Sequence, residues 1–246
     1  MVATATDLLE RFGAVTAYTE SDEISLVWPP AAPQGVQVLP FNGRVQKVVS
    51  VTAGDASARF NKHMLAQTFD PQTEAALIAR VEASEAHFDA RLFSLPSAER
   101  VHAYMRWRAV LDCRRNSISM LAQAHFSHDE LQGVDAVTCV RMLRERRDVR
   151  WEDTPPFFRF GTYIKKEEYW KTAYNPRTRQ EVRMRRTRCA AARGRWRCGT
   201  HARRGGSTSR GTRPTPSASR DSAPSASAVM TCLVKDRVAA PSLSNQ

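Results

Sequence analysis

Hydrophobic and polar positions in the first part of the chain predict a helix end followed by a hairpin. Leu8, Leu9 and Phe12 are spaced as on one helix face, and Gly13 follows where a helix commonly ends. β-Branched and aromatic residues dominate 14–18 and 24–28, which is typical of strands. The polar residues 19–23 between them predict a turn that carries acidic side chains.

Helical spacing dominates the middle of the chain. After a proline-rich loop over 29–40, apolar residues recur with a helical period over 44–61 and, more weakly, over 74–85. Residues 88–95 alternate as in a strand that ends at Pro96. The longest helical pattern covers 97–125, and Ser127 with Glu130 has the spacing of a capping box that begins another helix.

Strand patterns return after Pro155 and Pro156. Residues 157–164 and 168–174 predict strands, 175–178 predict a turn, and a last basic strand ends near Arg188. Strands and helices therefore interleave with antiparallel hairpins. This order predicts an α+β fold in which an antiparallel sheet has its helices, those of 44–61 and 97–125, on one face.

The composition changes at Cys189. Arg, Ser, Gly, Pro and Ala dominate 189–246, and a segment of this kind buries too little apolar surface to order itself. We therefore expect a main domain over 1–150, a basic strand region over 151–188 and a disordered tail over 189–246. The tail has the composition of a shifted reading frame, and the similarity described below also stops at Arg188.

The formal net charge of +12 favours a polyanionic partner such as nucleic acid. Ten Lys and Arg against two Asp place most of this excess in 189–246. Five irregularly spaced cysteines argue against a disulfide framework, and no apolar run is long enough to span a membrane. These features predict a soluble cytoplasmic protein. Cys189, Cys198 and His201 match no closed zinc pattern.

The acidic turn is the strongest candidate for chemistry. Phosphoryl and nucleotidyl transfer need carboxylates that hold divalent metal ions against phosphate oxygens, and Ser21, Asp22 and Glu23 offer such groups. A Ser-Asp-Glu turn alone is more often only a solvated acidic turn. The motifs that follow it in the sequence favour the metal-binding interpretation.

These motifs occur in one unbroken order between Ala14 and Arg188. They are the segments 41–44 with Lys47, 88–91, 107–117, 119–125, 127–133, 161–162, 165–166, 175–178 and 186–188. Together with the Ser-Asp-Glu turn they resemble the tRNA-histidine guanylyltransferase family, and residues 112–116 resemble its guanylyltransferase-like branch most.

The resemblance implies a palm-like domain, of the ferredoxin-like or polymerase-palm type, that extends RNA in the 3′-to-5′ direction. Such an enzyme activates the 5′ end of a tRNA with ATP or GTP and then lets the 3′ hydroxyl of an incoming GTP attack it. Two Mg²⁺ ions mediate the transfer, and family members commonly form homotetramers. Localisation in the cytoplasm, without a membrane partner, is expected.

Site residues follow from the same resemblance. Asp22 would be a metal ligand, with Glu23 as a second ligand or a structural acid, and Ser21 and Lys47 would contact triphosphate during activation. A solvent-facing role is a close alternative for Lys47. Contacts to nucleotide or RNA are expected from basic and amide side chains: Arg44, Arg114, Arg115, Asn116, Arg159, Lys165 and Lys166. For these residues a basic helix face or a soluble edge strand is the alternative.

The sequence departs from the family in one respect. Family members begin with a strand that ends in Asp-Gly-Arg and supplies the other metal carboxylate, whereas this chain contains no Asp-Gly. We therefore expect an N-terminally truncated palm with exposed strand edges, in which one ligand face of the two-metal site is missing. A catalytically impaired tRNA-binding homologue is the main alternative, and a palm-domain nucleotide cyclase is a more distant one.

Overall fold

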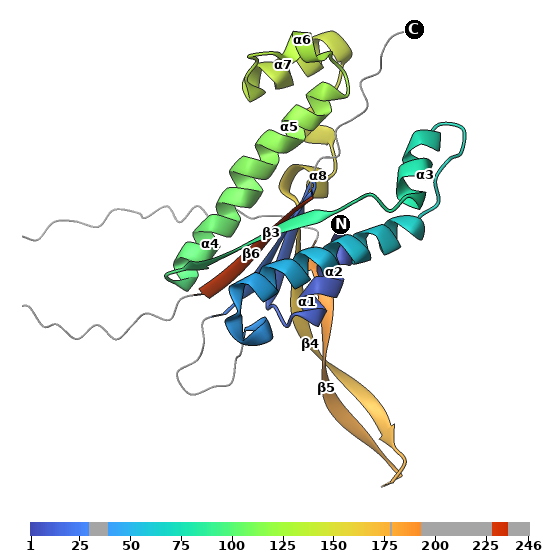
Figure 1. Ribbon diagram of the computed structural model, residues 1–246, viewed down its shortest axis with the longest axis vertical. Helices are drawn as coiled ribbons and strands as arrows, with labels where there is room; N and C mark the ends of the chain where they lie inside the picture. Colours follow the sequence, from blue (N-terminus) through green and yellow to red (C-terminus); the bar gives the residue numbers. More distant parts are fainter. Residues whose placement is uncertain (30–38, 178, 193–227, 236–246) are drawn as a thin grey trace, which may run out of the picture.

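The computed structural model describes residues 1–29, 39–177, 179–192 and 228–235. They form a six-stranded antiparallel sheet in the order β3-β6-β2-β1-β4-β5, with helices around it (Figure 1). The strands are β1 (Thr16–Glu20), β2 (Glu23–Trp28), β3 (Phe88–Leu95), β4 (Thr162–Asn175), β5 (Gln180–Ala192) and β6 (Ala228–Lys235).

The longer helices are α1 (Val2–Arg11), α2 (Val45–Leu65), α3 (Ala75–Glu82), α4 (Ala98–Trp107), α5 (Cys113–Gln123) and α7 (Ala136–Arg147). Short turns of helix are η1 (Pro40–Gly43), α6 (His128–Leu131), η3 (Trp151–Asp153) and α8 (Pro156–Phe160). A π-helical segment, η2 (Arg108–Asp112), joins α4 to α5. The class predicted from the sequence, α+β with an antiparallel sheet, is confirmed.

The predicted acidic hairpin is confirmed. β1 and β2 pair from Thr16 opposite Val27 to Glu20 opposite Glu23, so Ser21 and Asp22 alone form the turn. Ser21 has φ of +44°, a backbone region that non-glycine residues seldom adopt. Every residue of β2 after Glu23 is buried, because β2 lies inside the sheet.

Helices cover both faces of the sheet, so the prediction that they cover one face is wrong. Ala17 and Leu26 belong to a core cluster with Leu8 and Phe60 of α1 and α2. The next residues, Tyr18 and Val27, pack with Met105 and Ala109 of α4 and η2. Since successive strand residues point to opposite faces, the two clusters lie on opposite sides of the sheet. A third cluster joins α5 to α7.

Three predicted elements differ from the structure. The helix predicted over 97–125 contains the π-helical segment 108–112, and the helix predicted from Ser127 ends at Leu131 and restarts at Asp135. Ser127 does form the predicted capping box with Glu130. The strand predicted over 157–164 is instead α8 followed by β4, because Pro156 begins a helical turn and Gly161 ends it.

The segment predicted as a disordered tail contributes to the sheet. β5 continues past Arg188 to Ala192, and β6 pairs with both β2 and β3. The expectation of exposed edges beside β2 is therefore wrong, since β6 hydrogen-bonds along it. The rest of the predicted tail, 193–227 and 236–246, lies outside the described residues, and with it Cys198 and His201.

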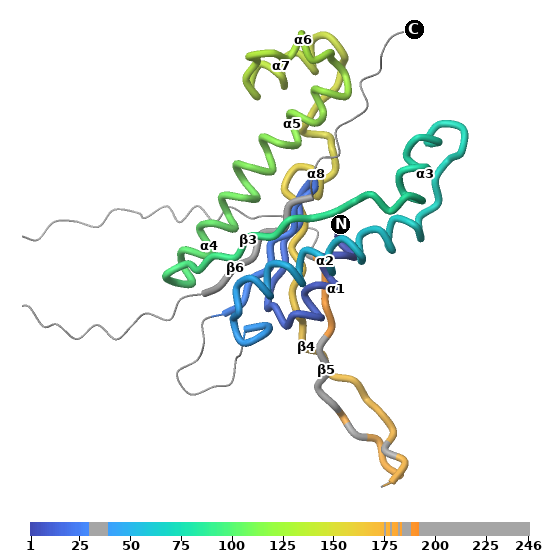
Figure 2. The backbone as a smooth tube through the Cα atoms, in the orientation of Figure 1, coloured from blue at the N-terminus to red at the C-terminus, as the bar shows by residue number. Residues whose placement is uncertain are grey.

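β4 and β5 extend beyond the sheet as a long two-stranded arm (Figure 2). Their first part is part of the sheet, because Thr162 to Lys165 pair with β1. Among the helices that the structure describes, none has the length and apolar character needed to cross a membrane.

Candidate functional site

The turn of the β1–β2 hairpin lies against α5. The Ser21 hydroxyl is 3.5 Å from Sδ of Met120, and Asp22 is half-buried beside it. The buried strands on both sides fix the position of this turn, so its polar side chains stay at one place on the molecular surface.

Arg108 binds the acidic residues at the base of the turn. Its guanidinium is 2.9 Å from Glu20 and also contacts Glu23 and, one helical turn further on, Asp112. Arg115 forms a second ion pair with Asp112 at 2.8 Å. Arg108, Glu20 and Asp112 are all buried. We call Arg108, Glu20, Glu23 and Asp112 the Arg108 cluster.

Burial controls the electrostatics of this cluster. It raises the pKa of the Glu20 carboxyl, and the hydrogen bond from Cys113 and the charge of Arg108 oppose this shift only in part. Burial likewise raises the pKa of Tyr18, whose hydroxyl donates to the carbonyl of Phe160 at 3.0 Å. The rings of Tyr18 and Tyr163 pack against each other at a tilt of 44°, with their centroids 4.6 Å apart.

The cluster contains the donor atoms of a cation site. One carboxylate oxygen from each of Glu20, Glu23 and Asp112 lies within 4.8 Å of the others, so these three residues could hold a metal ion. Oxygen donors suit hard divalent cations. The three carboxylates outnumber the two guanidinium groups that pair with them, those of Arg108 and Arg115, and a cation would offset the difference.

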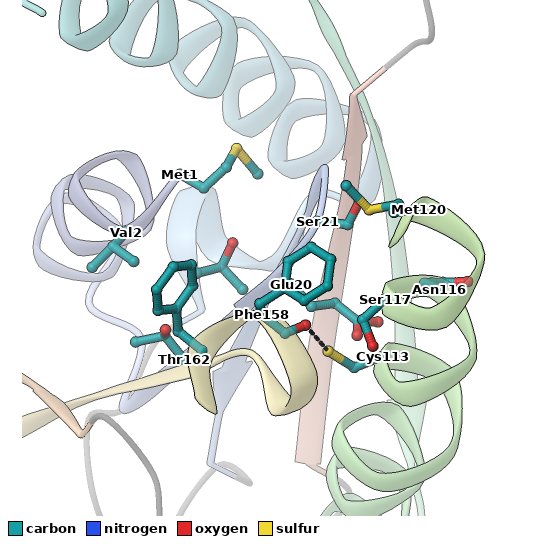
Figure 3. A pocket seen from close by; sticks show the side chains of 12 residues that line it. Met1, Val2, Glu20, Ser21, Cys113, Asn116, Ser117, Met120, Phe158 and Thr162 are labelled. Atoms are coloured by element: carbon teal, nitrogen blue, oxygen red, sulfur yellow. Dashed lines mark hydrogen bonds between the residues drawn. The ribbon is translucent and has the colours of Figure 1, made fainter. Parts of the chain in front are cut away.

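A pocket of about 290 Å³ opens beside the turn (Figure 3). Its polar lining comes from Glu20, Ser21, Asn116 and Ser117, and its apolar lining comes mainly from Met1, Val2, Met120, Phe157 and Phe158. An aromatic and apolar wall with a few polar groups at one side is typical of a small-ligand site. The pocket therefore places apolar surface next to the acidic cluster.

Gly161 holds one wall of the pocket in position. Its φ is +68°, and a Cβ at this residue would lie 2.5 Å from the Tyr18 hydroxyl oxygen and 2.7 Å from the Thr19 carbonyl oxygen. Only glycine fits this close approach between α8 and β1. The Cys113 thiol lies 3.7 Å from the Phe158 carbonyl oxygen and ties α5 to the same wall.

The structure brings together only some of the site residues predicted from the sequence. Ser21 and Asn116 line one pocket, and Glu23 and Arg115 both belong to the ion-pair network of Arg108 and Asp112. Asp22 lies in the turn itself but is not one of the three acids that converge. The role of each residue in catalysis or binding stays a prediction.

The remaining predicted residues lie elsewhere. The guanidinium groups of Arg114 and Arg159 stack on the ring of Trp151, at 5.2 and 5.6 Å from its centroid. Lys47 lies over the ring of Phe41 at 5.2 Å, and neither it nor Arg44 lines the pocket. Lys165 and Lys166 are exposed on β4.

Sequence reasoning did not single out Glu20, Arg108 or Asp112. One signal was present: Arg108 and Asp112 are four residues apart in a helical pattern, the spacing of an ion pair on one helix face. Nothing in the local sequence indicates that this pair lies against the hairpin, because Glu20 and Arg108 are almost ninety residues apart in the chain.

Comparisons with known proteins found similarity to one family. A family model described as tRNAHis guanylyltransferase matches residues 1–96. A curated relative, an uncharacterized protein of Acanthamoeba polyphaga mimivirus, is 28% identical over 176 residues, which cover 68% of this chain and 60% of that protein.

Two solved structures of bacterial tRNA(His) guanylyltransferase-like protein are also similar. The complex with ATP is 31% identical with a TM-score of 0.54, over 66% of this chain and 65% of that one. The complex with GTP is 26% identical with a TM-score of 0.49, over 77% and 67%. The chain thus spans less than two thirds of the curated relative and of the ATP-bound structure. The similarity to the ATP-bound structure extends to the palm-like fold.

Proposed function

We propose that the chain is a member of the tRNAHis guanylyltransferase family, whose model matches residues 1–96, and that it transfers GTP-derived nucleotides to the 5′ end of tRNA, in tRNA processing or repair. The 5′ end would first be activated with ATP or GTP, and the 3′ hydroxyl of an incoming GTP would then attack it. The similar bacterial protein with bound ATP supports a nucleotide as ligand.

One observation carries this proposal: an apolar pocket and a cluster of carboxylates meet at a single turn. Phe157 and Phe158 offer aromatic surface to a nucleobase, while Ser21 and Asn116 offer hydrogen-bonding groups at the polar side. Glu20 lines the pocket and also belongs to the acidic cluster. A base in the pocket would therefore direct its phosphates toward the acids at the turn.

The acids fit Mg²⁺ as the cofactor, since all their donor atoms are carboxylate oxygens. Glu23, one of these three acids, would hold it at the turn together with its neighbour Asp22, which the family resemblance adds, whereas the buried Glu20 and Asp112 keep Arg108 in place. Bound Mg²⁺ would stabilise the negative charge that develops on the transferred phosphoryl group. The second carboxylate face that the family uses is not among the described residues.

The protein's own groups would position the reactants. The Ser21 hydroxyl, which lies 3.5 Å from Sδ of Met120 at the pocket, would donate to a phosphate oxygen. Asn116 would bind the sugar or base edge from α5. Lys47 and Arg44 are exposed at the start of α2, and a role in activation would require the triphosphate to extend beyond the pocket.

Transfer RNA is the proposed macromolecular partner. Arg115, Lys165 and Lys166 are exposed, and Arg114 and Arg159 frame Trp151 on the same side of α5 and α8. Such side chains bind phosphates without reading sequence. A homotetramer, as the family resemblance implies, stays part of this proposal.

The test is 5′ labelling of a truncated or 5′-monophosphorylated tRNA with radioactive GTP in the presence of Mg²⁺ and ATP. Asp22→Asn should lower the rate at least 100-fold, because removing one pre-positioned charged group at a transition state costs on the order of 100-fold or more. Glu145→Gln, an exposed acid on α7, is the matched control and should keep the wild-type rate. Equal rates for the two variants would contradict the proposed role of the turn.

A second function, tRNA binding without catalysis, is favoured by the contacts of Arg108. Its guanidinium already forms ion pairs with Glu20, Glu23 and Asp112, the same three acids that could hold a metal ion. In that case the wild type should bind tRNA with strong salt dependence, Asp22→Asn should bind equally well, and no nucleotide should be incorporated at any Mg²⁺ concentration. Measuring binding and labelling on the same preparations separates the two functions.

A further inference from the structure

A second cavity lies between α5 and the segment that contains α6 and α7. These two helices stand at the end of α5, beyond the sheet (Figure 1), and α7 packs on α5 through an apolar cluster of its own. The cavity is an open groove with a volume of about 710 Å³. Sites for small ligands measure about 300–1,000 Å³, so a nucleotide fits here by size. We call this cavity the α5–α7 groove.

The floor of the α5–α7 groove is apolar. Ile118, Ala122 and Phe126 recur every four residues along α5 and the turn after it, and all three are buried. Leu131 of α6 and Cys139 of α7 contribute to the lining from the other side. Such a floor suits the flat, weakly polar surface of an aromatic ligand.

A polar stripe runs along one edge of this floor. Arg115, Ser119 and Gln123 are also four residues apart on α5, and all three are exposed. The Gln123 amide donates to the Ser119 hydroxyl at 3.2 Å, and His128 of α6 adds ring nitrogens to the lining. Amide, hydroxyl and imidazole groups both donate and accept hydrogen bonds, as recognition of a base edge requires.

The charges at the groove suit a phosphate. Of its lining residues in the described part of the chain, Arg115 alone has a permanent positive charge and Asp135 alone a carboxylate. One terminal nitrogen of Arg115 pairs with Asp112, and a guanidinium has five N–H donors. The Asp135 carboxylate already accepts a hydrogen bond from the backbone at the start of α7, at 2.7 Å. Arg147 adds positive charge over the Phe126 ring, 5.1 Å from its centroid.

α5 connects the groove to the candidate site. Asn116 and Met120 line the pocket at the hairpin turn, and their neighbours Arg115 and Ser119 line the groove. Successive helix residues point about 100° apart, so the two cavities lie on adjoining sides of one helix. With side chains a helix is about 10 Å across. An RNA strand that ends in the pocket can therefore reach the groove.

We propose that the α5–α7 groove binds an unpaired nucleotide of the RNA, with the base on the apolar floor and a phosphate at Arg115. The identity of the ligand as RNA rests on the proposed function, to which the groove adds a second binding site. An unpaired base exposes both a flat face and a hydrogen-bonding edge, whereas pairing occupies that edge. A partner helix would instead need an apolar groove without a polar stripe along it.

Gln123→Glu tests this proposal on the full chain. The substitution keeps the size of the side chain, but a carboxylate repels phosphate and no longer donates to a base. Fluorescence anisotropy with a labelled single-stranded RNA decamer should show binding weakened by about fivefold or more. Gln72→Glu, which is exposed in the loop before α3, adds the same charge elsewhere and should bind as the wild type does. Both residues are exposed, so both variants should keep the wild-type melting temperature.

Photo-cross-linking locates the bound RNA. With 4-thiouridine in the same decamer, mass spectrometry should find cross-links in the peptides that carry Phe126 and His128. Gln123→Glu should reduce these cross-links and leave those to the β4–β5 arm unchanged. Cross-links confined to other segments, or equal RNA affinity of Gln123→Glu and the wild type, would overturn the proposal.

The results separate this inference from the proposed function, because neither measurement uses transferase activity. If RNA binds in the groove but no nucleotide is added to tRNA, the proposed transfer fails and the groove site stands. If tRNA is labelled and Gln123→Glu leaves its KM unchanged, the groove site fails and the transfer stands. Sedimentation in which Gln123→Glu dissociates a wild-type oligomer, with RNA affinity unchanged, would show that a second copy covers the groove and would also overturn the inference.

Discussion

Arg108 joins acids that come from two distant parts of the sequence. Glu20 and Glu23 flank the hairpin turn, Asp112 lies one helical turn after Arg108, and the arginine contacts all three. It belongs to a π-helical segment, a rare irregularity that often marks functional sites. Its position therefore couples the α4–α5 helix to the turn that carries Asp22.

Replacing Arg108 should destabilise the protein strongly. Arg108→Met leaves the buried carboxylate of Glu20 without its ion-pair partner and leaves Asp112 with Arg115 alone, and breaking a buried ion pair in this way costs about 3–5 kcal/mol. Chemical denaturation followed by circular dichroism measures this destabilisation. Arg115→Met is the matched control, because the Arg115 side chain is 71% exposed and its ion pair with Asp112 is worth little. Destabilisation of the same size in both variants would contradict a structural role specific to Arg108.

The β4–β5 arm presents arginines stacked on aromatic rings. Arg183 lies over Trp170 at 5.0 Å and Arg188 over Tyr169 at 5.3 Å, and Trp170 is 57% exposed. Rings and guanidinium groups in alternation are typical of surfaces that bind single-stranded or looped RNA. The arm extends away from α5 and α8 (Figure 1), which contribute to the pocket, so it would contact RNA at a distance from the reacting 5′ end.

Removing two arginines of the arm should weaken tRNA binding without changing the fold. The double variant Arg183→Ala with Arg188→Ala should bind less tightly, and the slope of log K against log salt should fall by about one for each phosphate that is no longer bound. Filter binding over a range of salt concentrations measures both. The double variant Arg80→Ala with Arg100→Ala, on α3 and α4, removes the same charge away from the arm. If both double variants bind alike, net charge and not the arm determines affinity.

At the scale of the whole molecule, the candidate site is a meeting point of distant segments. The hairpin turn, the start of α1, α5 and α8 each contribute to the pocket, and β6 ends beside the same turn (Figure 3). The pocket therefore exists only when these segments have packed together. Nucleotide transfer and the cooperative fold should disappear together on denaturation.

Removing divalent cations should separate catalysis from RNA binding. A chelator in excess should abolish labelling of the tRNA 5′ end, since Mg²⁺ is the proposed cofactor, and added Mg²⁺ should restore it. Binding of tRNA should persist in the chelator, because the exposed arginines and lysines act on phosphates directly. Labelling that continues without divalent cations would contradict the assignment of Asp22 and Glu23 as metal ligands.

The sequence alone predicted the elements whose signals are local. Alternation, or spacing within a few residues, was enough to predict three elements. The structure confirms each of them: the Ser-Asp-Glu hairpin, the strand over 88–95 and the capping box at Ser127. The family resemblance rests on such local motifs as well. The site roles that it implies for Ser21 and Asp22 stay predictions.

The tertiary structure decided what depends on contacts between distant residues. Arg108 and Asp112 form an ordinary helical pair in the sequence, and only packing of η2 against the hairpin brings Glu20 and Glu23 to them. Likewise, residues 228–235 are an apolar run inside a segment, 189–246, whose overall composition predicts disorder, and the place between β2 and β3 offers this run hydrogen bonds on both sides. The helix and strand propensities of single residues do not reflect such partners, because these partners exist only once the rest of the chain has folded.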